Sequence, residues 1–276
     1  MTVFGFIGTG HLGSMLVHKF IETGAIYPED IMAANRTPEK AARLGQATGV
    51  QVAGNRIVAE LSDVLFICVR PADVRNVLSD LEDVLTADKL VVSVAADVRL
   101  EIMQSLCPAR LARAFPSMAS RKGQGVTLLC YADNATREDR SLISGLFQPL
   151  GGAEEVAEED FAVLADLTSC GPGYCAAIMR EFSLAAERKG ISPELAERLI
   201  GQTLLGTALL LQEESFSGLI ESVATKGGIT EAGVSVIREL APAMFDRLFQ
   251  ATEERHRPVR RRVEERGCRV LRKSIK

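Results

Sequence analysis

The sequence is poor in the side chains that build metal centres and disulfide frameworks. Its three histidines, His11, His18 and His256, are too few and too scattered for a metal site. Its cysteines form no CxxC pair and no zinc-like grouping, and most lie in apolar runs, as buried reduced cysteines do. The six are Cys68, Cys107, Cys130, Cys170, Cys175 and Cys268. We therefore expect a reduced chain that holds no metal.

Long apolar runs and a strong excess of one charge are also missing. No segment reaches the ~18 uninterrupted apolar residues that a membrane span requires. The chain opens directly on a strand, which leaves no room for a signal peptide. The net charge of −4 gives no general attraction to nucleic acid or acidic membranes. We expect a cytoplasmic protein that binds neither nucleic acid nor membranes.

One local excess of charge stands against that average. Nine Lys or Arg lie between Arg257 and Lys276, with only Glu264 and Glu265 against them. A basic tail can bind an anionic partner, but a solvated and partly frayed helix end is the commoner reason for such a run. We interpret the tail as a helix end.

The first half of the chain alternates strand-like and helical segments. With 276 residues, 47% hydrophobic and 25% charged, the chain suits one large domain or two ordinary ones. Strands alternating with helices predict parallel pairing through right-handed crossovers, and hence a doubly wound Rossmann domain over residues 1–157. The predicted strands are Val3–Ile7, Ile31–Ala34, Val64–Val69, Leu90–Val94, Leu111–Phe115 and Val126–Tyr131.

After about Asp160 the strand pattern stops, and residues 158–276 are predicted to form an all-helical domain. A helix over Phe161–Leu167 is expected to be interrupted at Cys170–Gly173, and Ser192 is a good N-cap for the helix that follows Gly190. Further helices are predicted at Ser217–Thr225, Thr230–Glu239 and Ala241–Glu254. No linker separates the halves, and a tight junction of this kind is where a cofactor and substrate cleft is expected.

A glycine-rich turn follows the first strand and opens a helix. It reads Gly8-Thr9-Gly10-His11-Leu12-Gly13, the GxGxxG pattern of dinucleotide-binding turns. Gly8 permits the tight turn, Gly10 lets a pyrophosphate approach the backbone, and Gly13 lets the helix pack on the strand. The free N–H groups of the helix N-terminus then hold the phosphate charge.

The end of the second strand indicates which dinucleotide binds. An acidic residue there would bind the 2′-hydroxyl of NAD, but the sequence reads Asn35-Arg36-Thr37. Arg36 can pair with a 2′-phosphate, so NADPH is predicted, with NADH as the alternative. Other strand ends offer further cofactor contacts: Asn55, Val69, Arg70, Pro71, Ala95, Ala96 and Pro116. Ala95 and Ala96 are small enough to admit the nicotinamide ring.

A second glycine turn lies in the helical half, between Val223 and Thr230. Paired Gly227 and Gly228 stand just before a new helix, and their free N–H groups can form a nest for an anion such as a carboxylate. Thr230 is also a good N-cap, which would be a purely structural role for its hydroxyl.

Together these motifs resemble pyrroline-5-carboxylate reductase, over nearly the whole chain to about residue 255. That family carries the N-terminal GxGxxG, an N-R-T-like end to the second strand and a V-K-P strand end, here Val69-Arg70-Pro71. More specific are three later motifs in the same order: S-G-S-G-P-A-Y, Q-T-x-x-G-A-A and S-P-G-G-T-T. They correspond to Thr168–Tyr174, Gln202–Ala208 and Thr225–Thr230.

The resemblance implies a Rossmann domain followed by a helical domain that interlocks two subunits in a homodimer or larger homo-oligomer. Thr225, Gly227, Gly228 and Ile229 would then bind the carboxylate of a small cyclic imino acid, with Lys226 adding positive charge beside them. Thr230 would place its hydroxyl near the imine nitrogen. The implied reaction is hydride transfer from NADPH to 1-pyrroline-5-carboxylate, which gives L-proline.

Several positions depart from the family pattern. Ser117-Met118-Ala119 stands where the family has N-T-P, Lys226 replaces a proline and Cys170 replaces a serine. Arg70 replaces a lysine, and Asp97 stands where glycine is usual. A reductase of another cyclic imine and a degenerate nucleotide-binding regulatory protein therefore stay open. The β-hydroxyacid dehydrogenases fit less well, because the helix after Pro172 has no lysine until Lys189.

Overall fold

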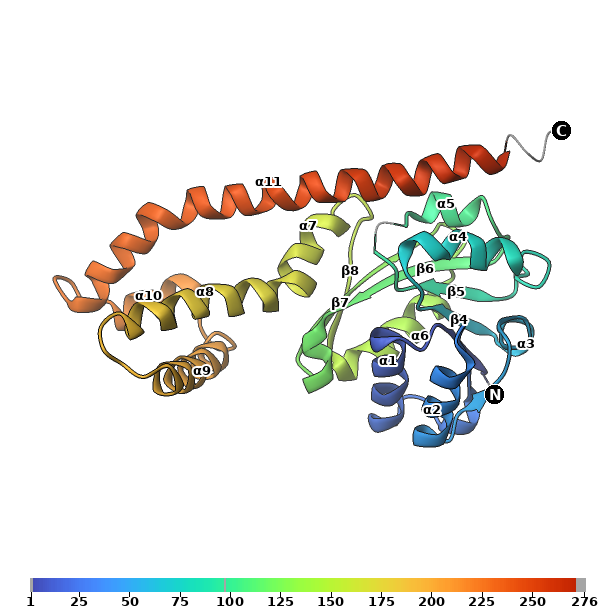
Figure 1. The fold of residues 1–276 in the computed structure, drawn as a ribbon, viewed down its shortest axis with the longest axis horizontal. Coiled ribbons are helices and arrows are strands. Elements are labelled where there is room, and N and C mark those ends of the chain that lie inside the picture. The colour runs from blue at the N-terminus through green and yellow to red at the C-terminus, as the bar shows by residue number, and fades with distance from the viewer. Residues whose placement is uncertain (1, 97, 272–276) are drawn as a thin grey trace. The chain divides into compact units, whose positions relative to one another are not determined.

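The computed structural model describes residues 2–96 and 98–271, with side chains as far as Arg255. Asp97, which departs from the family pattern, and the side chains of the basic tail lie outside the described residues. The chain divides into two compact units (Figure 1). The first comprises Met1–Cys170 together with the residues from Glu253 onward, and the second comprises Gly171–Thr252.

The first unit is built on an eight-stranded sheet. Its strands lie in the order β3-β2-β1-β4-β5-β6-β7-β8, and every neighbouring pair is parallel except β6 with β7. Continuous apolar runs form the central strands because both of their faces are covered. The strands are β1 (Phe4–Ile7), β2 (Ile31–Ala34), β3 (Gln51–Val52), β4 (Val64–Ile67), β5 (Leu90–Ser93), β6 (Arg110–Pro116), β7 (Gly125–Tyr131) and β8 (Gly151–Glu155).

Helices cover both faces of this sheet, which confirms the predicted doubly wound Rossmann-type plan. α1, α2 and α6 contribute to one buried cluster, and α3, α4, α5 and α7 contribute to the other. Their bounds are α1 (His11–Glu22), α2 (Pro38–Thr48), α3 (Asn55–Leu61), α4 (Pro71–Asp80), α5 (Leu100–Gln104), α6 (Arg137–Phe147) and α7 (Phe161–Ala165).

Four phenylalanines fix α1 and α6 against the centre of the sheet. Phe6 and Phe66 project from neighbouring strands and stack with their ring centroids 4.7 Å apart. Phe20 of α1 and Phe147 of α6 meet edge to face at 5.3 Å. All four rings are fully buried, and offset or edge-on pairs of this kind stabilise a core beyond the area they bury. This packing holds the glycine turn at the start of α1 in place.

Three predictions for the sheet need correction. β7 runs antiparallel to β6, because the two are joined by a short 3₁₀ segment (Met118–Lys122) rather than by a crossover helix. β8 was not predicted: its sequence GGAEE has no apolar run, and it pairs at the edge of the sheet. The strand expected over Val64–Val69 ends at Ile67, which leaves Cys68 and Val69 in the following loop.

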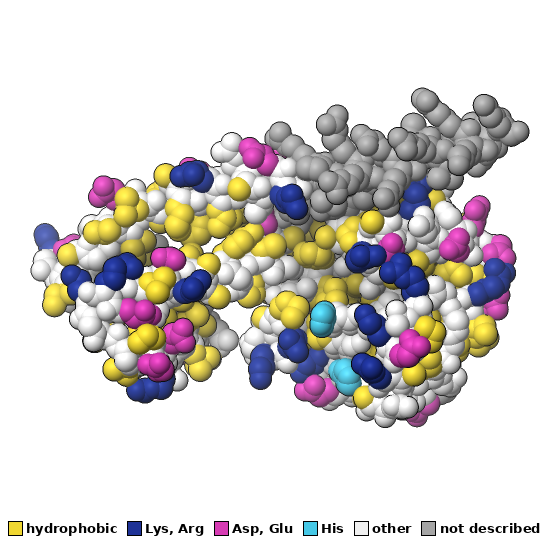
Figure 2. All heavy atoms as spheres, in the orientation of Figure 1, with side chains coloured by type: hydrophobic (Ala, Val, Ile, Leu, Met, Phe, Trp, Pro, Cys, Tyr) yellow, Lys and Arg dark blue, Asp and Glu magenta, His cyan; other side chains and the backbone are white. Residues whose placement is uncertain are grey.

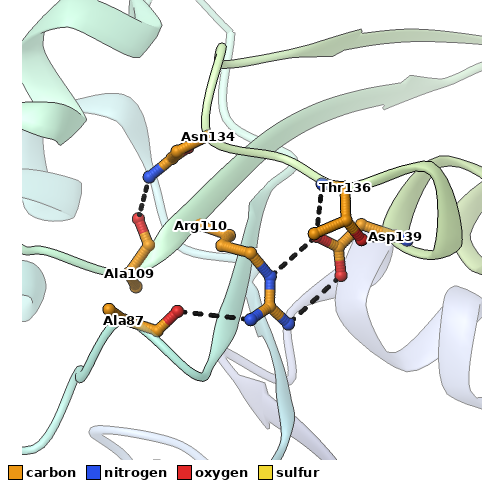
Figure 3. A network of polar contacts seen from close by, with 6 residues as sticks. All are labelled: Ala87, Ala109, Arg110, Asn134, Thr136 and Asp139. Carbon is orange, nitrogen blue, oxygen red and sulfur yellow. Dashed lines mark hydrogen bonds and ion pairs between the residues drawn. The ribbon is translucent and has the colours of Figure 1, made fainter.

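A polar network ties the start of β6 to α6 (Figure 3). The Arg110 guanidinium donates to both Asp139 carboxylate oxygens, at 2.7 and 3.2 Å, and to the Ala87 carbonyl at 3.2 Å. The Asp139 carboxylate also accepts from the Thr136 backbone N–H, and the Thr136 hydroxyl accepts from the Asp139 N–H, which completes a capping box for α6. Asp139 therefore serves the strand and the helix at once.

The second unit is entirely helical among its described residues. It contains α8 (Gly171–Glu187), α9 (Pro193–Leu210), α10 (Phe216–Val223) and the first part of α11 (Ile229–Leu271). The predicted N-cap is confirmed: the Ser192 hydroxyl accepts from the Leu195 N–H. α8 ends at Glu187, and Gly190, three residues later, has φ of 91°, a left-handed conformation that favours glycine.

Two helix boundaries differ from the prediction. The expected interruption at Cys170–Gly173 is absent, because a π-helical turn (Asp166–Cys170) leads directly into α8. Likewise, the helices expected at Thr230–Glu239 and Ala241–Glu254 are one helix, α11, which passes through Pro242 without ending. Proline removes one backbone hydrogen bond from a helix interior. α11 nevertheless continues on both sides of Pro242.

The helical unit has little core of its own. Only Ser183 and Ala196 are buried between Gly171 and Thr252, whereas large apolar side chains are exposed along all four helices (Figure 2). One helical stretch, Phe161–Glu187, is long and apolar enough to cross a membrane by length and composition alone. Its most apolar window has a mean hydropathy of 1.3 and is 17% buried.

Candidate active site

The glycine-rich turn after β1 has the geometry that its sequence predicts. Gly8 has φ of 105°, and a Cβ atom there would lie 2.5 Å from the Cys68 carbonyl oxygen. A Cβ atom on Gly13 would lie 2.0 Å from the Gly8 carbonyl oxygen. Gly10 has no atom within 4 Å of the place where its Cβ would stand. The first and last glycines are therefore required for close packing, and the middle one faces open space.

The N-terminus of α1 is not neutralised by the protein. Gly10 is its N-cap residue, no side chain caps the helix, and its first turn has no acidic residue. Beside it, Asn35 Nδ2 donates to the hydroxyl of the buried Thr9 at 2.7 Å, and Asn35 Oδ1 accepts from the Thr37 N–H at 3.0 Å. These bonds connect the loops after β1 and β2. The helix dipole and its first N–H groups therefore face a place suited to a phosphate.

A cleft of about 650 Å³ opens at the carboxyl ends of β1, β2 and β4. It is the usual ligand position in an open α/β sheet. It brings together eight of the residues predicted to bind the cofactor: Gly8, Gly10, Asn35, Arg36, Thr37, Asn55, Val69 and Arg70. The same cleft includes residues that the sequence reasoning did not identify: Ile7, Lys40, Cys68, Asp73, Asn76, Val77 and Asp80.

Two cations give one end of this cleft its charge. Arg36 follows β2, and Lys40 lies in the first turn of α2; both are exposed, and neither forms an ion pair with a side chain that the structure describes. Arg70, in contrast, pairs with Asp73 at 3.1 Å. Lys40 was missed because its place depends on helix geometry, although a lysine three residues after Thr37 was a usable signal. Arg36 and Lys40 together suit a dianionic 2′-phosphate.

Cys68 lines the cleft at the end of β4 but is not a nucleophile. Burial raises the pKa of its thiol to about 12, so the thiol stays protonated at neutral pH. The group lies behind the glycine turn, where a Cβ on Gly13 would approach the Cys68 Cβ to 3.0 Å. Its role is to pack the turn.

The other residues predicted to bind the cofactor lie outside this cleft. Thr9 and His11 line a second cleft of about 570 Å³ along α1, which shares Gly10 and Lys40 with the first. Leu12 and Gly13 are within α1, and Pro71 is the first residue of α4. Ala95 and Ala96 follow β5, while Pro116 ends β6. These last three lie further along the sheet, on the side away from Arg36.

The second glycine turn is a tight bend that precedes α11. Gly227 has φ of 75°, and the Gly228 N–H donates to the Thr225 carbonyl at 2.8 Å. Lys226 is exposed beside them. Ile229 begins α11, so Thr230 lies in its first turn and is not the N-cap residue that the sequence predicted. The side chain of Ile229 is 95% exposed.

A carboxylate of the chain already occupies part of this turn. Glu231 Oε2 accepts from the Gly227 N–H at 2.6 Å, a short charge-assisted hydrogen bond. The sequence reasoning did not identify Glu231, although an acidic residue in the first turn of a helix is a recognisable capping signal. The contact shows that the Gly227 N–H is placed to bind a carboxylate.

Two family models match the chain. One described as "NADP oxidoreductase coenzyme F420-dependent" matches residues 3–97, and one described as "Pyrroline-5-carboxylate reductase dimerisation" matches residues 158–259. ComE operon protein 4 of Bacillus subtilis is 29% identical over 258 residues, which are 91% of this chain and 94% of that protein. The pyrroline-5-carboxylate reductase of Pisum sativum is 30% identical over 234 residues, which are 83% of this chain and 85% of that enzyme.

The fold has the same relatives. The crystal structure of Plasmodium falciparum pyrroline carboxylate reductase with NADP bound aligns with a TM-score of 0.81 at 20% identity. The alignment covers 95% of this chain and 98% of that one. The nucleotide cleft and these matches define an NAD(P)H-dependent oxidoreductase. Identity to the pea enzyme across most of both chains narrows this further: the chain belongs to the pyrroline-5-carboxylate reductase family.

Proposed function

We propose that this enzyme reduces 1-pyrroline-5-carboxylate to L-proline with NADPH, as a cytoplasmic step of proline biosynthesis. The observation that carries the proposal is the pair of glycine turns, each leading into a helix N-terminus. The first faces open space in a cleft where Arg36 and Lys40 have no ion-pair partner among the described side chains, and the second already accepts a carboxylate. The family of the chain supports the choice of imine, since both the pea relative and the structural neighbour are pyrroline carboxylate reductases.

The residues of the first unit fit a bound NADPH. A cradle that excludes any Cβ at Gly8 and Gly13, and leaves Gly10 open, suits a pyrophosphate above α1. Arg36 and Lys40 would neutralise the 2′-phosphate, while Thr9, Asn35 and Thr37 hold the shape of that edge. When bound, the cofactor supplies the hydride that reduces the C=N carbon. Ala95, Ala96 and Pro116 would form the wall beside the nicotinamide.

The second unit would hold the substrate. The bend of Thr225, Lys226, Gly227, Gly228 and Ile229 would bind its carboxylate through backbone N–H groups, and Lys226 would add positive charge. Thr230 would hydrogen-bond the ring nitrogen and so orient the C=N bond; its hydroxyl is too weak an acid to act as a proton donor by itself. Alignment of the two reactants then contributes most to the rate.

A homodimer is proposed as the working form. The apolar surface of α8–α11 would be covered by a second copy, which also accounts for the low burial of the stretch Phe161–Glu187. The start of the dimerisation match at residue 158 supports a boundary between a cofactor domain, residues 1–157, and a substrate and dimerisation domain, residues 158–276.

Reduction of another cyclic imine is the second candidate. The contact between Glu231 and Gly227 makes it a specific alternative, because Glu231 would compete with a substrate carboxylate but not with an uncarboxylated ring. The similar protein ComE operon protein 4 is not named as a reductase.

NADPH oxidation tests both candidates. Absorbance at 340 nm would be followed with 1-pyrroline-5-carboxylate, with the uncarboxylated 1-pyrroline, with a β-keto acid and with no substrate. Oxidation with 1-pyrroline-5-carboxylate alone supports the first proposal, and oxidation with 1-pyrroline alone supports the second. No oxidation with either imine rejects both. Thr230→Ala should lower turnover more than cofactor affinity, and unchanged turnover would remove its proposed role.

A further inference from the structure

A buried ion pair lies where the strands of the first unit give way to α7. Arg113 of β6 and Glu158, in the segment between β8 and α7, meet with Nη1 and Oε1 at 2.7 Å. Their side chains are 5% and 18% exposed. Neither residue was identified from the sequence as part of a site. For two charges removed from water in this way, the desolvation penalty often exceeds the free energy of their attraction.

Glu158 also binds the element that follows β5. The same Oε1 atom accepts from the Leu100 backbone N–H at 2.8 Å, at the start of α5. Arg99 Nε lies 4.0 Å from the other carboxylate oxygen. One carboxylate therefore joins β6, the N-terminus of α5 and the segment before α7. A carboxylate at a helix N-terminus is favourable, and hydrogen bonds to a charged group are stronger than those between neutral groups.

Arg113 is held from a second side. Its guanidinium carbon lies 4.3 Å from the ring centroid of Phe161, the first residue of α7. Phe161 in turn packs on Phe115 of β6 at 6.0 Å between centroids. Arg113 Nε has no hydrogen-bond partner among the described residues. The arginine is thus fixed by stacking and by one carboxylate, and an apolar residue of similar volume would fill the space without leaving a donor unpaired.

The location of the Arg113–Glu158 pair suggests a reason for a buried ion pair whose desolvation is unfavourable. Leu100 follows the loop that carries Ala95 and Ala96, and Arg113 lies three residues before Pro116. These two loops leave the carboxyl edge of the sheet at β5 and β6, on the side away from Arg36 and Lys40. We propose that Glu158, held by Arg113, is a positioning residue that sets the loops after β5 and β6 for the nicotinamide half of the cofactor. This rests on the proposed nicotinamide wall at Ala95, Ala96 and Pro116.

The pair should therefore affect the two halves of NADPH differently. The adenosine half binds at β2 and is represented by 2′,5′-ADP, which lacks nicotinamide. Glu158→Ala and the isosteric Glu158→Gln are expected to leave 2′,5′-ADP affinity within about twofold. In Glu158→Ala, kcat should fall about 10- to 100-fold, because small misplacements of reacting groups cost rates of this order. Arg113→Met removes the charge that holds Glu158 and should also lower kcat. Arg113→Lys keeps the charge and should recover part of that loss.

Glu155→Gln is the matched control, since Glu155 lies three residues earlier and pairs with Arg140 at the surface. It should leave both ligands and kcat unchanged. Equal loss of 2′,5′-ADP and NADPH binding in the Glu158 variants would overturn the proposal in favour of a general structural role, and so would an unchanged kcat with bound NADPH. Glu158→Gln provides the same comparison if Glu158→Ala does not fold.

Failure of the proposed reaction can be told apart from failure of this inference. If the wild-type enzyme reduces no cyclic imine, the ratio of NADPH affinity to 2′,5′-ADP affinity still reports the nicotinamide contribution. That ratio should fall at least about threefold in Glu158→Ala, a change of about 0.65 kcal/mol or more that calorimetry can measure. An unchanged ratio would overturn the positioning role whatever the substrate.

Discussion

At the residue scale, we propose that two side chains, Arg36 and Lys40, determine the choice between NADPH and NADH. We expect Arg36→Ala to weaken NADPH about 10- to 100-fold, since a charged hydrogen bond contributes about 1.5–3 kcal/mol. NADH, which lacks the 2′-phosphate, should change less than about twofold. Fluorescence titration of both nucleotides measures this.

Arg56→Ala is the control for that titration, because Arg56 is an exposed arginine that pairs with Asp83 and Glu60 and does not line the cleft. It should alter neither nucleotide. An equal effect of Arg36→Ala on NADPH and NADH would remove the 2′-phosphate assignment, and Lys40→Ala would then be the next cation to examine.

We propose that Glu231 sets a second preference at the same scale, the preference between imine substrates. Its carboxylate holds the Gly227 N–H, so removing the charge should favour a carboxylated substrate. We expect Glu231→Gln to lower KM for 1-pyrroline-5-carboxylate about three- to tenfold, which corresponds to about 0.7–1.4 kcal/mol. KM for 1-pyrroline should stay constant. Glu239→Gln, an exposed glutamate further along α11, should change neither value.

A parallel fall in KM for both imines would contradict this account, because only the carboxylated substrate competes with Glu231. No change for either would mean that the carboxylate of Glu231 only caps α11. In that case, the preference for one imine over another would have to come from residues other than Glu231.

At the element scale, the network of Arg110, Thr136 and Asp139 should stabilise the sheet without affecting catalysis. It lies at the start of β6, whereas the cleft opens at the carboxyl ends of the strands (Figure 3). Asp139→Asn leaves Arg110 partly buried without a counter-charge, which should cost about 2–4 kcal/mol. A thermal melt should show a Tm lower by roughly 5–10 °C. kcat at 25 °C should not change.

Glu138→Gln is the control for this melt, since Glu138 is the exposed neighbour in the first turn of α6. It should leave Tm within about 2 °C. An unchanged Tm in Asp139→Asn would mean that the amide satisfies Arg110 and the capping box as well as the carboxylate does.

The sequence predicted the elements whose physics is local. The runs that form β1, β2, β4 and β5 are apolar except for Ser93 at the end of β5, because they are buried on both faces. β2 was predicted with its observed bounds. β8 was missed because an edge strand of sequence GGAEE needs little apolar surface. The direction of β7 depends on the length of its connection to β6, which periodicity does not report.

The candidate site divides in the same way. The roles of the glycines were predictable from the sequence. Glycine is the residue that tolerates a positive φ or an approach too close for a Cβ atom. Lys40, Glu158 and Glu231 were not predictable, because each acts through a contact set by helix geometry or by packing across the fold. Charged side chains have many possible partners, and their sequence context alone does not select one.

At the scale of the whole molecule, the helical unit is the least self-sufficient part. Between Gly171 and Thr252 two residues are buried, and the exposed side chains include Leu204, Leu205 and Leu209 at 42%, 56% and 55%. Apolar surface of this extent is typical of an interface between subunits. The family model that matches residues 158–259 is described by dimerisation, which agrees with that interpretation.

A charge in this surface should separate the subunits. Leu205→Glu places a carboxylate on a side chain that is 56% exposed in the single chain, and burying it in a dimer would leave it unpaired. Light scattering at micromolar concentration should show a dimer or larger form for the wild type and a smaller form for the variant, with a loss of imine reduction. Leu61→Glu is the matched control, because Leu61 of α3 is 58% exposed but belongs to the first unit. A wild-type monomer, or dissociation caused equally by Leu61→Glu, would contradict the assignment of α8–α11 as the interface. Activity that persists in a monomeric Leu205→Glu enzyme would show that one chain completes the site by itself.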